Sequence, residues 1–143
     1  YGPLEKPNPV RTVMSPVFHW CRAALNGDEV ELTDNLVRDL TYVSDTARCV
    51  VLASRKATPG YRVYNASYGE NLRFSDILQS LTRIRPGFRF RVKATGGGAS
   101  FFKDSLRGPL SMKRAREDLG FAPQYDIEHG LGRYLDWLER HPI

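Results

Sequence analysis

Apolar residues recur at helical spacing in several stretches of this chain, and glycine or proline closes each stretch. One stretch runs from Val10 to Leu25 and ends at Asn26-Gly27; another runs from Phe74 to Ile84 and ends at Arg85-Pro86-Gly87. Apolar residues at i, i+3, i+4 and i+7 indicate a helix that buries one face. Glycine or proline just past such a stripe ends the helix. The chain is therefore expected to build several short amphipathic helices around a shared core.

Short runs typical of strands separate these helices. We expect helices after Ser15, from Ser44-Asp45 to about Ser54, over Phe74–Ile84, over Ser111–Leu119, and from Asp126 to His141-Pro142. We expect strands over Glu29–Leu32, Leu36–Val43, Tyr61–Asn65 and Phe88–Val92, with a short extended piece ending at Leu72. This alternation predicts the α/β class, in a mixed α+β arrangement of short strands interleaved with helices.

The length and composition fit one ordinary globular domain. The chain has 143 residues, of which 41% are hydrophobic and 26% charged, so we expect a single domain over residues 1–143. No apolar run is long enough to span a membrane, and no charged-then-apolar leader opens the chain. Because residue 1 is Tyr1 and the first methionine is Met14, we expect the chain to have been cut from a longer protein.

The cysteines and histidines indicate neither a disulfide framework nor a metal site. Cys21 and Cys49 lie on or near apolar faces of predicted helices. A disulfide or a reactive thiol is one interpretation, but we favour two buried free cysteines in a reduced compartment. Together with the missing leader, this predicts a cytoplasmic protein. The histidines have no cysteine or carboxylate partner at ligand spacing, so no metal is expected.

The net charge of +5 comes from one part of the sequence. Between Arg83 and Arg116 stand ten lysines and arginines against one acid, Asp104. Three interpretations remain open for this segment: a solvated surface, a nucleic-acid face, or a pocket for a phosphorylated small molecule, because arginine forks suit phosphate oxygens. The glycine run within Thr95–Ser100 could cradle phosphate, but without a following Lys-Ser/Thr we interpret it as a connector.

Catalytic signatures are missing from the sequence. No Gly-x-Gly-x-x-Gly follows a predicted strand, and no Gly-x-Ser-x-Gly occurs. None of the seven tyrosines has a lysine four residues further on, so a Tyr-x-x-x-Lys acid/base pair is absent. This chain alone is therefore predicted neither to bind NAD appreciably nor to turn over a substrate.

Several short motifs occur in a familiar order along the chain. They are Tyr1-Gly2-Pro3, the run Arg38–Ala47, Tyr64-Asn65 with Gly69-Glu70, the tail from Arg107-Gly108-Pro109 through Leu119-Gly120-Phe121-x-Pro123, and Gly130-Leu131 with Tyr134-Leu135-x-Trp137. In this order, from residue 1 to about 139, the chain resembles the C-terminal, substrate-binding part of the NAD-dependent epimerase/dehydratases, the extended short-chain dehydrogenase/reductase family. One departure is Ser111, where the family commonly has aspartate.

The resemblance implies roles for particular residues. Arg38 matches an arginine that contacts the diphosphate of a nucleotide sugar, and Arg85 and Arg107 are both candidates for a second such arginine. Tyr1 and Pro3 match a turn near the nicotinamide and the sugar. Asp45 matches an aspartate expected to cap the following helix. For Arg38, a surface ion pair with Asp39 or Asp34 stays the alternative.

The resemblance also implies partners that the chain lacks. The NAD fingerprint and the Tyr-x-x-x-Lys pair would lie in an N-terminal NAD-binding part, which supplies the Rossmann half; the complete enzyme would use NAD or NADP and form a homodimer. Where this part docks, we expect exposed apolar residues over Val10–Phe18. The alternative function is a non-enzymatic polyanion-binding or nucleic-acid-binding module that uses residues 83–116, although nucleic acid is not the expected partner. A degenerate fragment with a scaffolding role is a third possibility.

Overall fold

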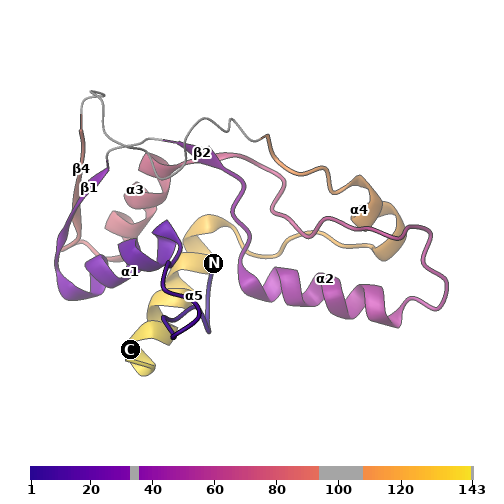
Figure 1. The fold of residues 1–143 in the computed structure, drawn as a ribbon. Helices are drawn as coiled ribbons and strands as arrows, with labels where there is room; N and C mark the ends of the chain where they lie inside the picture. The colour runs from indigo at the N-terminus through magenta and orange to yellow at the C-terminus, as the bar shows by residue number, and fades with distance from the viewer. Residues whose placement is uncertain (33–35, 94–107, 143) are drawn as a thin grey trace.

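The computed structural model describes residues 1–32, 36–93 and 108–142. Its elements follow in the order α1 (Pro16–Asn26), β1 (Glu29–Leu32), β2 (Val37–Arg38), α2 (Val43–Arg55), β3 (Leu72–Arg73), α3 (Phe74–Ile84), β4 (Arg89–Val92), α4 (Lys113–Leu119) and α5 (Ile127–Arg140). Figure 1 shows them in two groups: α1, α3, α5, β1 and β4 gather at one end, while α2 and α4 extend to the other. The predicted mixed α/β class is confirmed.

Helix α1 begins and ends as its sequence predicts. The Ser15 hydroxyl accepts a hydrogen bond from the Phe18 N–H at 3.2 Å, Pro16 occupies the first helical position, and Gly27 ends the helix with φ of 78°. Each feature satisfies or avoids an unpaired backbone group at a helix end. The apolar stripe before Ser15 is not helical, and its members Val10 and Val13 are 95% and 72% exposed.

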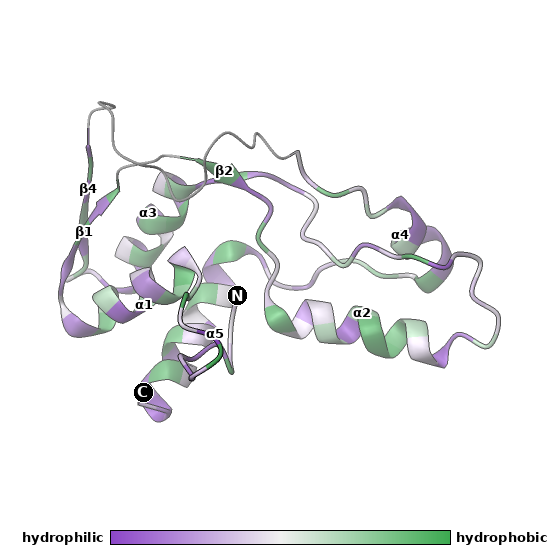
Figure 2. Cartoon of the chain, viewed as in Figure 1, coloured by the Kyte–Doolittle hydropathy of each residue, from purple (hydrophilic) through white to green (hydrophobic). Residues whose placement is uncertain are grey.

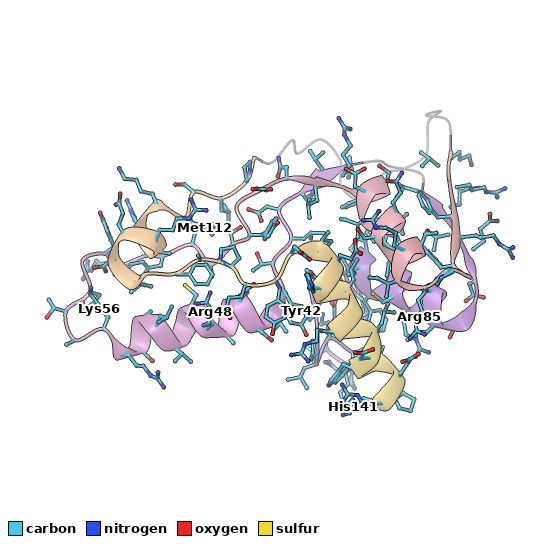
Figure 3. The ribbon with its side chains drawn as sticks, turned by 180° about the vertical axis from the view of Figure 1, so that it is seen from behind. Tyr42, Arg48, Lys56, Arg85, Met112 and His141 are labelled. Atoms are coloured by element: carbon cyan, nitrogen blue, oxygen red, sulfur yellow. The ribbon has the colours of Figure 1, made fainter. Side chains whose placement is uncertain are left out.

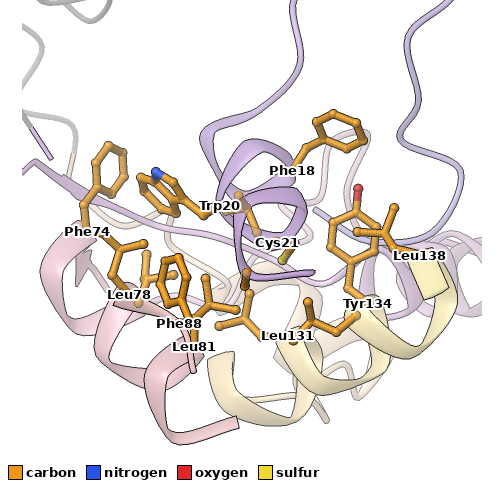
Figure 4. Close-up of a cluster of buried hydrophobic side chains, with 14 of the residues drawn as sticks. Phe18, Trp20, Cys21, Phe74, Leu78, Leu81, Phe88, Leu131, Tyr134 and Leu138 are labelled. Carbon is orange, nitrogen blue, oxygen red and sulfur yellow. The ribbon is translucent and has the colours of Figure 1, made fainter. Parts of the chain in front are cut away.

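The main core lies between α1, α3 and α5. Figure 4 shows Cys21 of α1 facing leucines of α3 and α5, and the Trp20 ring lies edge-on to Phe74 with centroids 4.9 Å apart. Each helix turns its periodic apolar face inward, as expected for an amphipathic helix. The fully buried members include Val17, Cys21, Ile77, Leu78, Leu81, Phe88, Leu131, Tyr134, Leu135 and Leu138. Within the described residues, no helix has the length and apolarity to cross a membrane.

Two pairs of short strands border this core. β1 and β4 are parallel, with Glu29 opposite Arg89 and Leu32 opposite Val92, which confirms both predicted strands. β2 and β3 are antiparallel and only two residues long. The predicted strand over Leu36–Val43 is therefore wrong beyond Arg38, because β3 offers no longer partner and α2 begins at Val43.

The predicted strand over Tyr61–Asn65 is also wrong. Side chains, not a strand ladder, make the contacts of this segment: the Tyr61 N–H donates to the Tyr64 hydroxyl at 3.2 Å, and the Asn65 amide donates to the Ser111 carbonyl at 2.9 Å. β-branched and aromatic residues favour a strand only where a partner strand is available.

A smaller core joins α2 to α4. Cys49, Met112, Ala115 and Phe121 are buried together there. Asp118 holds the segment before Tyr64 against α4: its carboxylate accepts from the Gly60 N–H at 2.8 Å and from the Tyr64 hydroxyl, and Lys56 lies 3.1 Å away. Both cysteines are free and buried, as predicted. The predicted cytoplasmic location stays a prediction.

Helix α2 does not start with the aspartate cap that the sequence predicts. Its N-cap is Tyr42, which makes no side-chain capping bond. Asp45 is instead 1% exposed, and its carboxylate accepts from the backbone N–H groups of Gln124 at 2.9 Å and Tyr125 at 3.1 Å. Asp45 therefore has a structural role, but it fixes the segment that enters α5 and not its own helix.

We predict that Asp45→Asn destabilises the fold by about 2–3 kcal/mol, because hydrogen bonds to a charged acceptor contribute that much and the new amide would face a buried N–H. The matched control is Asp76→Asn, which changes another first-turn aspartate that is exposed. Urea unfolding should show a change below about 0.5 kcal/mol for the control, as for most surface substitutions. Equal losses for the two variants would contradict the role given to Asp45.

Candidate functional site

Arg38 ends the short strand β2 and lies opposite Leu72 of β3. The Phe74 N–H donates to the Leu36 carbonyl at 2.9 Å and extends this pairing into α3. The Arg38 side chain is half-buried, and its guanidinium donates to the Val37 carbonyl at 2.8 Å. The predicted diphosphate-binding arginine therefore belongs to a strand and not to a loop.

Asp39, the next residue, joins three segments of the chain. Its carboxylate accepts from the Ser67 hydroxyl, from the Gly69 N–H at 3.2 Å and from the Leu110 N–H at 3.0 Å. Gly69 has φ of 85°, a left-handed conformation in which other residues are strained, and an added Cβ would also displace the Met112 methyl group, which lies 2.6 Å away. We call Asp39 with Ser67, Gly69 and Leu110 the Asp39 clamp.

Sequence reasoning missed this clamp. Asp39 and Gly69 each lie within one of the short motifs, but the sequence predicts for Asp39 only an ion pair with Arg38. One sequence signal was available: an aspartate directly after a short strand can accept hydrogen bonds from the backbone of a glycine turn elsewhere in the chain. Leu110 contributes a backbone N–H, and a backbone donor cannot be predicted from the pattern of side chains.

The structure does not bring Arg85 to Arg38. Arg85 follows the last residue of α3 and forms an ion pair with Glu139 of α5, whereas β3 and Arg38 lie at the opposite end of α3. Helix α3 has 11 residues, so its two ends are about 16 Å apart along the axis. Figure 3 shows Arg85 beside α5. Arg107, the other candidate, lies outside the described residues; the segment that follows it in sequence reaches Asp39 through Leu110.

The turn formed by Tyr1-Gly2-Pro3 packs on the start of α2. The Val43 N–H donates to the Tyr1 carbonyl at 2.9 Å, and the Tyr1 amine donates to the Thr41 carbonyl at 3.0 Å. Gly2 has φ of 136°, and an added Cβ would lie 2.7 Å from the Val43 Cγ1 atom. The turn is thus held tightly, and no larger residue fits at its centre.

The Tyr1 ring points into the protein. It lies 5.6 Å from the Tyr42 ring, and its hydroxyl touches the Gly130 backbone at the place where a Cβ would stand. Burial raises the pKa of the Tyr1 phenol well above its ordinary value. Pro3 lines a shallow cleft of about 250 Å³ with Tyr1, Gly2, Leu4, Glu5, Arg11 and Val43. The lining is mixed, because Pro3, Leu4 and Val43 are apolar whereas Glu5 and Arg11 are charged and pair with each other at 2.9 Å.

Several basic side chains of residues 83–116 form ion pairs with acids elsewhere in the structure. Of the eight basic residues that the structure describes between Arg83 and Arg116, five have an acidic partner, and for four of them this partner comes from another segment. The pairs are Arg83–Glu128, Arg85–Glu139, Arg91–Glu31, Lys93–Glu31 and Lys113–Glu117. Arg114 lies over the Tyr61 ring. Four carboxylates outside the segment therefore offset part of its positive charge, although the pairs are largely exposed to solvent.

Metal chemistry finds no support in the described part of the chain. Across residues 1–32, 36–93 and 108–142, no three His, Cys, Asp or Glu side chains are grouped to hold an ion.

No family model matches this chain. Among curated proteins it is 26% identical over 144 residues to UDP-glucuronate 4-epimerase from Thermodesulfobacterium geofontis, covering 99% of the chain and 41% of that protein. It is 25% identical over 146 residues to dTDP-glucose 4,6-dehydratase from Streptomyces griseus, covering 99% of the chain and 40% of that protein. The chain thus spans about two-fifths of the length of these relatives.

Solved structures show the same relationship. A UDP-glucose 4-epimerase from Thermotoga maritima, solved with UDP-glucose, matches 98% of the chain and 43% of that structure with a TM-score of 0.75 at 25% identity. A UDP-glucuronic acid 4-epimerase from Bacillus cereus shares the fold, with a TM-score of 0.74 at 19% identity over 98% of the chain and 42% of that structure. The predicted resemblance to the C-terminal part of NAD-dependent epimerase/dehydratases is confirmed.

We predict that Gly130→Ala destabilises the fold by about 1–3 kcal/mol, because the new methyl group overlaps the Tyr1 hydroxyl in a packed core. Tyr1→Phe removes the nearest atom and leaves the ring carbon Cζ at 3.0 Å, so the cost of Gly130→Ala should shrink in that background. Thermal unfolding of the two single variants and the double variant measures this coupling.

The control is Gly132→Ala in the same helix, where an added Cβ meets nothing within 4 Å. This substitution should stabilise the helix by up to about 1 kcal/mol. If Gly130→Ala behaves like Gly132→Ala, the Tyr1 ring is not held against α5.

Proposed function

We propose that this chain is the C-terminal, substrate-binding part of an NAD-dependent nucleotide-sugar epimerase or dehydratase, and that Arg38 binds the diphosphate of the substrate. The observation that carries the proposal is the match over 98% of the chain to an epimerase solved with UDP-glucose. The curated relatives that act on UDP-glucuronate and dTDP-glucose support the same substrate class.

Arg38 is suited to a diphosphate for physical reasons. Its planar guanidinium can donate two parallel hydrogen bonds to phosphate oxygens. The side chain is half-buried, so a charge-assisted bond there is stronger than one in open water. The strand pairing of β2 with β3 and the Asp39 clamp hold its backbone on both sides. A held arginine loses less conformational freedom when it binds a ligand.

NAD would be held mainly outside this chain. The sequence has no glycine-rich dinucleotide fingerprint, so the residues here do not fit the NAD pyrophosphate. The cleft at the N-terminal turn is lined by Pro3, Leu4 and Val43 together with the Glu5–Arg11 ion pair, and its apolar side chains would contact the nicotinamide ring there. When bound, NAD supplies the hydride transfer of such enzymes; an N-terminal part would supply the acid/base tyrosine.

Exposed apolar side chains support the presence of such a further part. Val50 and Val51 of α2 are 63% and 42% exposed. Of the stretch Val10–Phe18, where exposed apolar residues were expected, Val10 and Val13 are exposed, but the prediction is wrong for Met14, Val17 and Phe18, which are buried in the core. Figure 2 shows hydrophobic residues along α2. Exposed apolar side chains of this kind are expected where a further part of the protein packs. A homodimer of the complete enzyme stays a prediction.

We predict that Arg38→Lys in the complete protein weakens UDP binding about tenfold, because lysine keeps the charge but loses the bidentate fork. Arg38→Ala should weaken it further. The matched control is Arg85→Ala, which removes an arginine paired with Glu139 at the far end of α3 and should change the UDP dissociation constant less than twofold. Calorimetric titration with UDP, dTDP and UMP measures these effects.

Other outcomes would point elsewhere. If the wild-type protein binds neither UDP nor dTDP but holds a single-stranded oligonucleotide, the polyanion alternative is right and the proposal fails. If both Arg38 variants bind UDP like wild type but unfold at clearly lower temperature, Arg38 has a structural role. Unchanged binding in Arg38→Ala together with a loss in Arg85→Ala would exchange the two assignments.

A further inference from the structure

We propose that Asp39 is a positioning residue that sets the direction in which Arg38 meets the substrate phosphates. This inference rests on the proposed function, since it requires a diphosphate at Arg38. Asp39 touches no substrate atom in this scheme. It acts through the backbone it shares with Arg38 and through the segments it holds in place.

The first argument is that β2 alone constrains Arg38 weakly. The ladder with β3 has two residue pairs, Val37 with Arg73 and Arg38 with Leu72. Two pairs leave the strand free to twist at its end, where Arg38 stands. Asp39 follows Arg38 directly, and its carboxylate is fixed by donors from two other segments, residues 67–69 and Leu110. Asp39 therefore supplies the restraint that a longer ladder would otherwise give.

The second argument is the quality of the clamp. A carboxylate accepts hydrogen bonds only, and here its oxygens receive one hydroxyl and two backbone N–H groups. Ser67, one of the donors, is 2% exposed, so water cannot easily replace the contact. The Thr41 hydroxyl adds a bond from the Tyr68 N–H at 3.0 Å, which fixes the same two segments two residues further on. These side-chain bonds thus continue the contact between the two segments beyond the two residue pairs of the β2–β3 ladder.

The structure provides its own control for a carboxylate clamp. Asp118 also joins loop segments by accepting from a backbone N–H and a hydroxyl, those of Gly60 and Tyr64. It lies on α4, and its partner Lys56 stands at the outer end of α2 in Figure 3. Asp118 therefore matches Asp39 in chemistry but has no contact with the strand that carries Arg38.

The test compares Asp39→Asn with Asp118→Asn in the complete protein. Both variants should lower the unfolding temperature, because each replaces an accepting carboxylate oxygen with an NH₂ group that faces hydrogen-bond donors. Asp39→Asn should also weaken UDP binding about tenfold while changing UMP binding less than threefold, since the second phosphate depends on the direction of Arg38. With a nucleotide-sugar substrate, KM should rise while kcat changes little. Asp118→Asn should leave UDP binding within twofold.

A double-mutant cycle with Arg38→Lys separates positioning from general loosening. If Asp39 acts through Arg38, the combined variant should bind UDP only slightly more weakly than either single variant. The cycle of Asp118→Asn with Arg38→Lys should be additive. If Asp39→Asn does not fold, Ser67→Ala removes one donor of the clamp without stranding a charge and should weaken UDP binding about threefold in the same non-additive way.

Two results would overturn the inference while leaving the proposed function intact. One is additive behaviour of Asp39→Asn, or of Ser67→Ala, with Arg38→Lys. The other is an equal change in UDP binding for Asp39→Asn and Asp118→Asn. Wild-type protein that binds neither UDP nor dTDP would instead defeat the proposed function itself, and with it this inference.

Discussion

The two groups of elements are joined where the start of α2 meets the segment entering α5, and Asp45 makes that junction. Its buried carboxylate holds the Gln124 and Tyr125 N–H groups, and the Tyr42 ring lies 4.7 Å from the Tyr125 ring. A buried charge persists only where hydrogen bonds compensate its lost hydration. The site at Arg38 depends on this junction, because β2 leads into it through residues 39–41 and Tyr1 contacts Tyr42 and Val43 at the start of α2.

In the group around α2 and α4, aspartate carboxylates accept the backbone hydrogen bonds that a strand ladder would satisfy in a sheet. Asp39, Asp45 and Asp118 each hold backbone N–H groups of segments that have no strand partner. Backbone groups in such segments still need hydrogen bonds when they approach a core. Side-chain acceptors provide these bonds with little regular structure, which leaves the strand that bears Arg38 short and its surroundings well fixed.

The sequence predicted the helices well because their signals are local. Ser15 with Pro16, the apolar face of α3, and Asp126 before α5 each specify a helix end or a buried face within a few residues. The strands over Leu36–Val43 and Tyr61–Asn65 were wrong because strand formation depends on a distant partner. The motifs led correctly to the related proteins, but the Asp39 clamp and the partners of Arg83 and Arg85 were out of reach, since each joins residues at least 28 positions apart.

The contact between Tyr1 and Gly130 has a consequence for how the chain folds. Tyr134 adds a second link of the same span, because its hydroxyl donates to the Glu5 carbonyl at 3.3 Å. Contacts so distant in sequence close late, since the loop entropy is lost before they form. During synthesis, α1 and α3 leave the ribosome well before α5 can cover them, so their shared apolar surface stays open until the final helix emerges. Truncation within α5 would expose the Tyr1 turn and the α1–α3 surface together.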